Sequence, residues 1–266
     1  MFRPLAALLL ATLSITAFAA PAQAANASLG VSGTRFVLTT ADGRRLDSAA
    51  LIGAVFDMVT PEGINAKVRI DGISAAAEAS DVTLHNLSVE SSPGKWSPLC
   101  AADAKGRSAA FPMLGRWQGR RFVADAKAWF LTCTSGSQAK CRLWGFDPWG
   151  SDPRRSPLRP LYEACQHMVR ADYDGSGVAH TRDGTSIDGW GDIGDERPES
   201  LNDPLFAFEA GWGPRGAVCV ARTRWEILLP TRVLLAKNPH LRGNPCDEAE
   251  ARRRGAVLFN RSKLRP

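Results

Sequence analysis

The chain has 266 residues, of which 33 are Lys or Arg and 27 are Asp or Glu, so its formal net charge is +6. The basic residues are spread along the chain instead of forming one stripe interleaved with aromatic side chains, which argues against a nucleic-acid-binding surface. This length is enough for one large domain or two small ones, and either would bury a core of its own.

The N-terminus has the pattern of an export signal. Arg3 precedes a run without charge over residues 5–19, and the small-residue triplet Ala22-Gln23-Ala24 follows. Such a run is too short for a membrane span and is typical of a cleaved signal peptide, so we expect residues 1–24 to be removed. No later stretch approaches the roughly 20 apolar residues of a transmembrane helix. We therefore expect an exported protein, periplasmic or extracellular, with no transmembrane segment in its mature chain.

Every cysteine lies beyond this signal. The six residues are Cys100, Cys133, Cys141, Cys165, Cys219 and Cys246. An even number of thiols in an exported chain is expected to form disulfides, because the destination is oxidising. The sequence leaves the pairing open. No C-x-x-C pair or cluster of histidines indicates a transition-metal site.

Residues 25–99 are predicted to form a small antiparallel β module. Short apolar segments are separated by the turn formers Asp42-Gly43, Pro61-Glu62-Gly63 and Asp71-Gly72. The expected strands are 35–39, 51–56, 66–70 and 81–89. This module carries little candidate chemistry.

Residues 100–266 are predicted to form a disulfide-bonded mixed domain. Helical periodicity covers 161–172, and shorter helices are expected over 231–237 and 247–254, the last capped by Asp247 and ended by Gly255. Further strands are expected at 128–132, 217–222 and 256–259. Because no βαβ alternation with a phosphate-binding glycine loop occurs, the predicted fold class is α+β with segregated elements.

Several sequence blocks between Trp96 and Ser262 stand out. They read F-L-T-C-T-S-G-S-Q-A-K-C-R-L-W-G-F-D-P-W, A-C-Q-H-M-V-R-A-D-Y-D-G-S-G, H-T-R-D-G-T-S-I-D, F-E-A-G-W-G-P-R-G-A-V-C-V-A-R-T-R-W and G-A-V-L-F-N-R-S. In this order they resemble the ADYC domain family, which implies an exported, cysteine-rich bacterial protein and no particular activity. Asp174 departs from the family tetrapeptide, which ends in Cys, and Asn238 stands where the family pattern has Cys before Pro239. The resemblance therefore implies that one disulfide has been lost as a pair.

Two acidic loops have oxygen ligands at spacings that suit a cation. Asp172, Asp174, Ser176, Gly177, His180 and Asp183 match a calcium-loop template. Two features argue against calcium. The last ligand position of the template, position 12, holds Asp183, which is shorter than the Glu of an EF-hand. The segment after Asp183 predicts a turn into a strand, where an EF-hand has its exit helix. The interpretation that we favour is a helix C-terminus that runs into a glycine turn. The second loop carries Asp188, Asp192, Asp195 and Glu196 between glycines, which is also typical of a solvated surface loop.

Candidate catalytic and binding residues lie in the same half of the chain. His167, His180, Asp172 and Asp183 are close in sequence and could form an acid/base group with a serine, although Gly175-Ser176-Gly177 is not a nucleophile elbow. Trp144, Trp149, Trp190 and Trp212 stand beside Gly and Pro. They are expected to anchor a loop-rich core, or else to form a carbohydrate-binding face.

The function that we expect is non-catalytic binding in the cell envelope or outside the cell, with a glycan or a protein as ligand and no cofactor. One alternative is a secreted hydrolase that uses the His167, His180, Asp172 and Asp183 group. Another is a structural accessory protein. A cleft that gathers these polar groups around a hydroxyl favours the enzyme, whereas a flat, exposed tryptophan patch favours binding.

Overall fold

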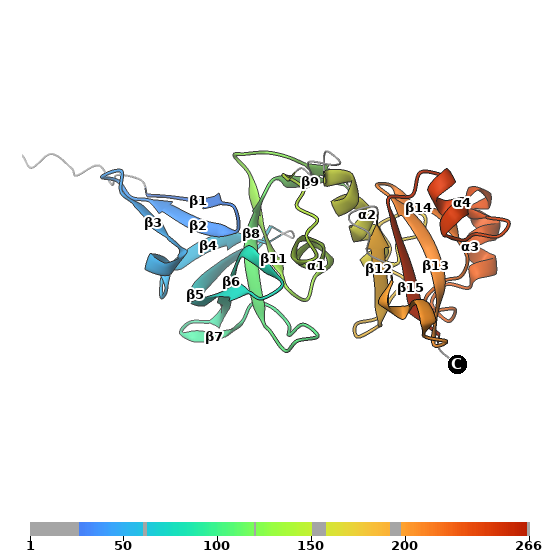
Figure 1. The fold of residues 1–266 in the computed structure, drawn as a ribbon. Coiled ribbons are helices and arrows are strands. Elements are labelled where there is room, and N and C mark those ends of the chain that lie inside the picture. The colour runs from blue at the N-terminus through green and yellow to red at the C-terminus, as the bar shows by residue number, and fades with distance from the viewer. Residues whose placement is uncertain (1–26, 61–62, 120, 151–157, 192–197, 265–266) are drawn as a thin grey trace, which may run out of the picture.

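The computed structural model describes residues 27–60, 63–119, 121–150, 158–191 and 198–264. The signal peptide expected over residues 1–24 lies outside these ranges. Several antiparallel sheets and a few short helices make up the described chain, which confirms the α+β class. Figure 1 shows two strand-rich parts, with α1 and α2 between them and α3 and α4 at the C-terminal end.

The N-terminal part is built from two antiparallel sheets. One has the order β1-β2-β3, and the other has the order β11-β8-β6-β5-β4 with β7 paired to β6. A hydrophobic cluster joins the two sheets through Phe36, Ile70 and Leu87. The strands are β1 (Ser28–Ser32), β2 (Arg35–Thr39), β3 (Arg45–Asp47), β4 (Val55–Val59), β5 (Asn65–Ala76), β6 (Ala79–Ser92), β7 (Lys95–Pro98), β8 (Ala109–Leu114) and β11 (Trp129–Cys133).

The larger sheet continues past residue 99, where we expected the N-terminal module to end. Strand β8 pairs with β6, with Ala109 opposite Asn86, and β11 adds to the far side of β8. A boundary between residues 99 and 100 would therefore cut through one sheet. Pairing between strands far apart in sequence leaves no local pattern, so this continuation of the sheet has no signal in the sequence.

The strand expected over residues 51–56 is also displaced. Asp47 accepts hydrogen bonds from the backbone N–H groups of Ala49 and Ala50, so a 3₁₀ turn, η1 (Ser48–Leu51), forms first. Gly53, with φ at +87°, then redirects the chain into β4. The apolar residue Leu51 is thus buried by a turn and not by a strand.

The C-terminal part is a four-stranded antiparallel sheet in the order β12-β15-β13-β14. Its strands and the adjoining helices are β12 (Ile187–Gly191), β13 (Phe206–Gly213), β14 (Gly216–Val220), β15 (Leu258–Lys263), η2 (Glu199–Asn202), α3 (Thr231–Lys237), η3 (Pro239–Leu241) and α4 (Glu248–Arg253). The short helices predicted after Pro230 and after Asp247 are confirmed, and Asp247 caps α4 by accepting from the N–H of Glu250. No helix in the described ranges is long and apolar enough to cross a membrane.

Helices cover both faces of this sheet. Successive residues of a strand point to opposite faces, so neighbouring residues of β13 contact different helices. Ala210 and Trp212 of β13 belong to the core cluster that contains α2. Gly211, between them, faces α4, and a Cβ atom there would lie 2.3 Å from the Cβ of Ala251. Only glycine therefore allows α4 to approach this strand so closely.

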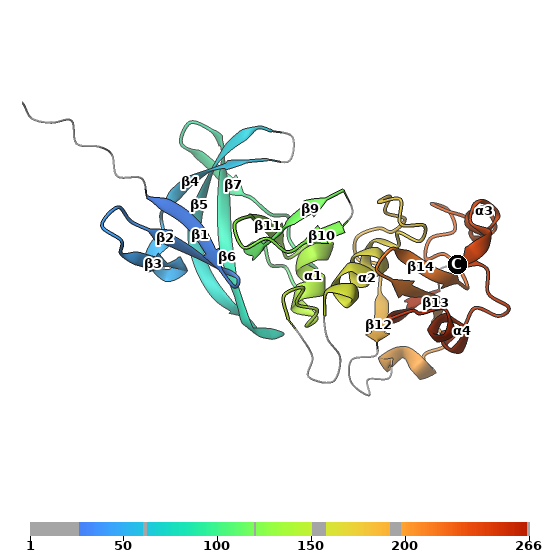
Figure 2. The same ribbon diagram turned by 90° about the horizontal axis from the view of Figure 1, so that it is seen from above.

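Two central helices join the parts of the chain. They are α1 (Ser137–Leu143) and α2 (Arg159–Arg170), and a hairpin of β9 (Arg116–Gln118) and β10 (Arg121–Val123) lies beside them. One hydrophobic cluster contains Phe111 of β8, Tyr162 of α2 and Trp212 of β13, so the two strand-rich parts share a continuous core. This arrangement fixes α2 in the middle of the molecule (Figure 2).

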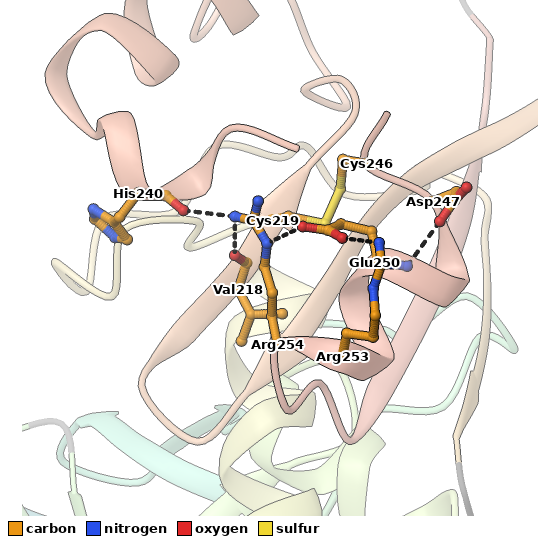
Figure 3. Close-up of a disulfide and its surroundings, with 8 residues drawn as sticks. All are labelled: Val218, Cys219, His240, Cys246, Asp247, Glu250, Arg253 and Arg254. Atoms are coloured by element: carbon orange, nitrogen blue, oxygen red, sulfur yellow. Dashed lines mark hydrogen bonds and ion pairs between the residues drawn. A yellow bond between two sulfur atoms is a disulfide. The ribbon is translucent and has the colours of Figure 1, made fainter. Parts of the chain in front are cut away.

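All six cysteines form disulfides, as predicted from their even number. The pairs are Cys100–Cys133, Cys141–Cys165 and Cys219–Cys246. The second pair ties α1 to α2, and the third ties β14 to the start of α4 (Figure 3). With sequence separations of 24 to 33 between partners, each cross-link should contribute roughly 2 to 4 kcal/mol by restricting the unfolded chain.

Arg254 reinforces the region around the third disulfide. Its guanidinium donates to the backbone carbonyl of His240 at 2.9 Å and pairs with the Glu250 carboxylate at 2.5 Å (Figure 3). The end of α4 is thereby tied to η3 as well as to β14. Surface pairs of this kind contribute little individually, so the disulfide provides most of the restraint.

Candidate binding groove

Helix α2 presents a polar stripe. Glu163, Gln166, His167 and Arg170 recur at spacings of three and four residues, which places them on one face of the helix. The opposite face is apolar and packs into the core. Gln166 and His167 are nevertheless buried, so neighbouring elements must satisfy them.

His167 is oriented by Asp172. Ala171 ends α2 in the left-handed conformation, with φ at 51°, and this reversal brings Asp172 back beside the last helical turn. The two side chains meet at 2.9 Å between Nδ1 and Oδ2, and both are buried. The N–H of Gly177 donates to both carboxylate oxygens of Asp172. With Nδ1 held at this carboxylate, Nε2 is the ring nitrogen that is left for a ligand.

Three cavities adjoin this stripe, and we call them together the α2 groove. The first has a volume of about 370 Å³ and the second about 660 Å³, and His167 lines both. The third, of about 590 Å³, shares Ser137 and Arg170 with the first. The walls come from the β9–β10 hairpin, from α1, from the β13–β14 turn and from the segment before β12. Each volume is in the range of pockets that hold small molecules or single sugar units.

The Gly175 turn forms one wall of the second cavity. Its φ is +66°, and a Cβ atom there would lie 2.1 Å from the carbonyl oxygen of Arg215. Glycine therefore lets this turn lie directly against the β13–β14 turn. Asp174 is exposed on the cavity wall beside it, and its carboxylate accepts from the N–H of Ser176. Partial burial opposes ionisation, but the hydrogen bonds from Ser176 prevail and hold the pKa of Asp174 below its ordinary value.

The groove is lined by several cations. Arg121 and Arg215 line the second cavity, and Lys140 and Arg182 line the third. None of these four side chains forms an ion pair with another described residue. Burial raises the pKa of the Glu163 carboxyl in the second cavity, although Arg159 and Arg121 act in the opposite direction.

A buried polar network holds the end of α2 in place. Arg224 donates through Nε and Nη2 to the two carboxylate oxygens of Glu209, each at 3.0 Å, and it donates to the last carbonyls of α2 at Met168 and Val169. Tyr173 donates to the same carboxylate at 3.0 Å. Burial, together with the nearby carboxylate, raises the pKa of the Tyr173 phenol. The helix terminus that carries His167 is therefore fixed by a satisfied ion pair.

Of the predicted catalytic group, the structure brings together only His167 and Asp172. His180 contacts the carbonyl of Ala171 through Nδ1 at 3.3 Å, and Asp183 is exposed at the third cavity. The Ser137 hydroxyl lines the groove but donates to Gln166 at 2.8 Å. In the described part of the chain, no hydroxyl is hydrogen-bonded to His167.

The residues of the calcium template are not gathered around one point. Asp172 is engaged by His167 and Gly177, Asp174 lies at the second cavity and Asp183 at the third. Ser176 lies in the turn that follows Asp174. Across the described ranges, no group of three or more His, Cys, Asp or Glu is arranged to hold a metal ion. After Asp183 the chain turns into β12, as predicted.

The second acidic loop is only partly described. The carboxylate of Asp188 accepts from the N–H of Ser200 at 2.7 Å, which links β12 to η2. Asp192, Asp195 and Glu196 lie outside the described residues.

The four singled-out tryptophans have different surroundings. Trp190 and Trp212 are buried, and Trp212 donates to Asn260 at 2.7 Å, so these two anchor the core. Trp144 is 48% exposed and lines the third cavity, whereas Trp149 is 44% exposed and lines a separate cavity. Trp117, which the sequence did not single out, lines the first cavity. They do not form one flat patch.

Sequence reasoning missed most of the groove. The polar stripe on α2 could have been found from the helical spacing of Glu163, Gln166 and Arg170 around His167. No local signal marks Arg224 and Glu209, because the antiparallel pairing of β13 with β14 brings them together.

This geometry defines an α+β, disulfide-bonded protein with a polar groove beside a central helix. The family model for the ADYC domain matches residues 48–226, and the chain therefore belongs to the ADYC domain family. The match includes β4 to β8, so the family region contains the larger sheet as well as the groove. Searches of curated proteins and of solved structures gave no match.

Proposed function

We propose that this protein is exported and binds a glycan in the α2 groove without cleaving it. The observation that carries the proposal is that three cavities adjoin, sharing His167, Ser137 and Arg170 as common walls. A series of adjacent cavities suits an extended chain better than a compact ligand. Trp117 and Trp144 offer apolar faces for sugar rings, and the polar stripe of α2 offers partners for sugar hydroxyls.

The Asp172–His167 pair supports binding as follows. Asp172 fixes the imidazole, so Nε2 can accept a hydrogen bond from a sugar hydroxyl at small cost in side-chain entropy. The same arrangement is what a general base needs, which favours a hydrolase as the second candidate. Against the hydrolase, Ser137 is the one serine among the described residues that line the two cavities beside His167, and its hydroxyl donates to Gln166.

Export is supported by the signal-like N-terminus and by the three disulfides. The proposed location is the periplasm or the extracellular medium. N-terminal sequencing of the mature protein should begin after Ala24. An intact Met1 on folded protein in the cytosol would contradict the export proposal.

Binding can be tested by intrinsic tryptophan fluorescence and calorimetry with a panel of neutral and acidic hexasaccharides. Trp144→Ala should weaken binding about tenfold or more, because an aromatic anchor that the ligand buries contributes roughly 2 kcal/mol. Trp149→Ala is the matched control, since Trp149 is similarly exposed but lines a separate cavity. Equal loss in both variants, or no binding of any hexasaccharide, would contradict the proposal. Appearance of shorter sugars that depends on His167 would identify the hydrolase.

A further inference from the structure

The charges of the α2 groove differ from those of a neutral binding site. Lys140 of α1, Arg170 of α2 and Arg182 of the segment before β12 all line the third cavity. Because they come from three separate elements, the fold itself brings their positive charges together. Concave surfaces lined by one sign of charge concentrate the field that attracts an oppositely charged ligand.

These cations retain donors for a ligand. Arg170 donates through Nη2 to the carbonyl of Gly177, which uses one of its N–H groups. The guanidinium carbon of Arg182 lies over the Trp225 ring, 4.7 Å from its centroid, and this contact leaves the N–H groups of Arg182 for hydrogen bonds with a ligand. Lys140 forms no ion pair with any described residue.

The carboxylates of the groove do not balance these cations. Asp183 is the one carboxylate among the described residues that line the third cavity. Arg224 also lines this cavity, but its charge is paired with the buried carboxylate of Glu209. In the first cavity, the charge of Asp172 is already used by His167 and Gly177. In the second cavity, Glu163 and Asp174 face two arginines.

We propose that the ligand of the α2 groove is an acidic glycan, with carboxylates on its sugar rings that pair with Lys140, Arg170 and Arg182. This inference rests on the proposed binding function. Arginine and lysine form their strongest hydrogen bonds with carboxylates and other oxyanions. Trp144, which lines the same cavity, provides a face for a sugar ring. The combination fits a uronic-acid chain better than a neutral glycan or a polyanion without rings.

A matched pair of ligands tests the charge alone. Hexagalacturonic acid and its fully methyl-esterified form have the same rings and length but differ in carboxylate charge. We expect the acid form to bind at least about tenfold more tightly, with an affinity that falls as sodium chloride rises. Lys140→Gln and Arg182→Gln should each reduce this preference several-fold. Arg232→Gln on α3, away from the groove lining, is the control and should leave it unchanged.

Each other outcome has a definite meaning. If the ester binds as tightly as the acid and Trp144→Ala weakens both, the acidic inference is overturned and glycan binding stands. If polyphosphate binds as tightly as the acid and Trp144→Ala has no effect, the site recognises polyanions and the glycan is overturned. If only neutral hexasaccharides of the panel bind, the acidic inference is overturned and glycan binding stands, whereas both proposals fail if no hexasaccharide of the panel binds. The salt titration uses the unaltered protein, so it remains decisive if a variant does not fold.

Discussion

His85 should make the folded protein sensitive to mild acid. Its side chain is fully buried in β6, where Nε2 lies 2.8 Å from the Ser48 hydroxyl and the ring packs edge-on against Phe36 at 4.9 Å. Nδ1 has no hydrogen-bond partner among the described residues. Burial lowers the pKa of His85 from 6.5 to about 4, because the charged ring cannot be solvated there.

The sign of the effect follows from the two states. The folded protein keeps His85 neutral, whereas the unfolded chain takes up a proton as the pH falls below 6.5. Full stability is therefore present above pH 6.5, and it is lost as the pH falls toward 4. At about 1.4 kcal/mol per pKa unit, the complete loss is about 3 kcal/mol, and about 2 kcal/mol of it should have occurred by about pH 5.

The test compares urea unfolding of the natural protein and of His85→Asn, followed by tryptophan fluorescence at neutral pH and near pH 5. The natural protein should lose about 2 kcal/mol more than the variant between these conditions. His240→Asn, at an exposed histidine, is the control and should behave as the natural protein. Equal losses in the natural protein and in His85→Asn would refute the reasoning. If that variant does not fold, the His85 ring resonances in NMR should still show no titration between pH 7 and about 5.

Three further outcomes are expected. Arg224→Met should lower the free energy of unfolding by about 3 to 5 kcal/mol, because it leaves the Glu209 carboxylate buried without its cation. Adding Glu209→Leu should recover part of this loss. A loss below about 1 kcal/mol would show that the ion pair is dispensable. Asp174→Cys with Asn238→Cys should form a fourth disulfide and stabilise the protein by roughly 2 to 4 kcal/mol. A free-thiol assay that finds both new thiols unpaired would refute the hypothesis that Asp174 and Asn238 mark a disulfide lost from the family pattern. Millimolar calcium should leave the melting temperature almost unchanged, since Asp172 is engaged by His167; a rise of several degrees that Asp172→Ala abolishes would mean that calcium binds.

The sequence by itself determined the local elements and the state of the cysteines. Strand β2 and helix α3 were predicted to within a residue, because their apolar spacing and flanking turn residues are local signals. The cap at Asp247 is local for the same reason. Disulfide formation followed from an even number of thiols after an export signal. The polar stripe of α2 is also a local feature, because it consists of polar residues at helical spacing.

Only the tertiary structure decided which of these parts meet. The larger sheet extends to residue 133 because β8 and β11 pair with strands far back in the chain, and such pairing has no local pattern. The His167–Asp172 pair depends on a left-handed residue at Ala171, where the usual glycine signal is absent. Arg182 and Lys140 line the same cavity although they are far apart in sequence. Sequence periodicity specifies the face that a residue occupies, whereas its neighbours are set by packing between elements, and the groove is made of such neighbours.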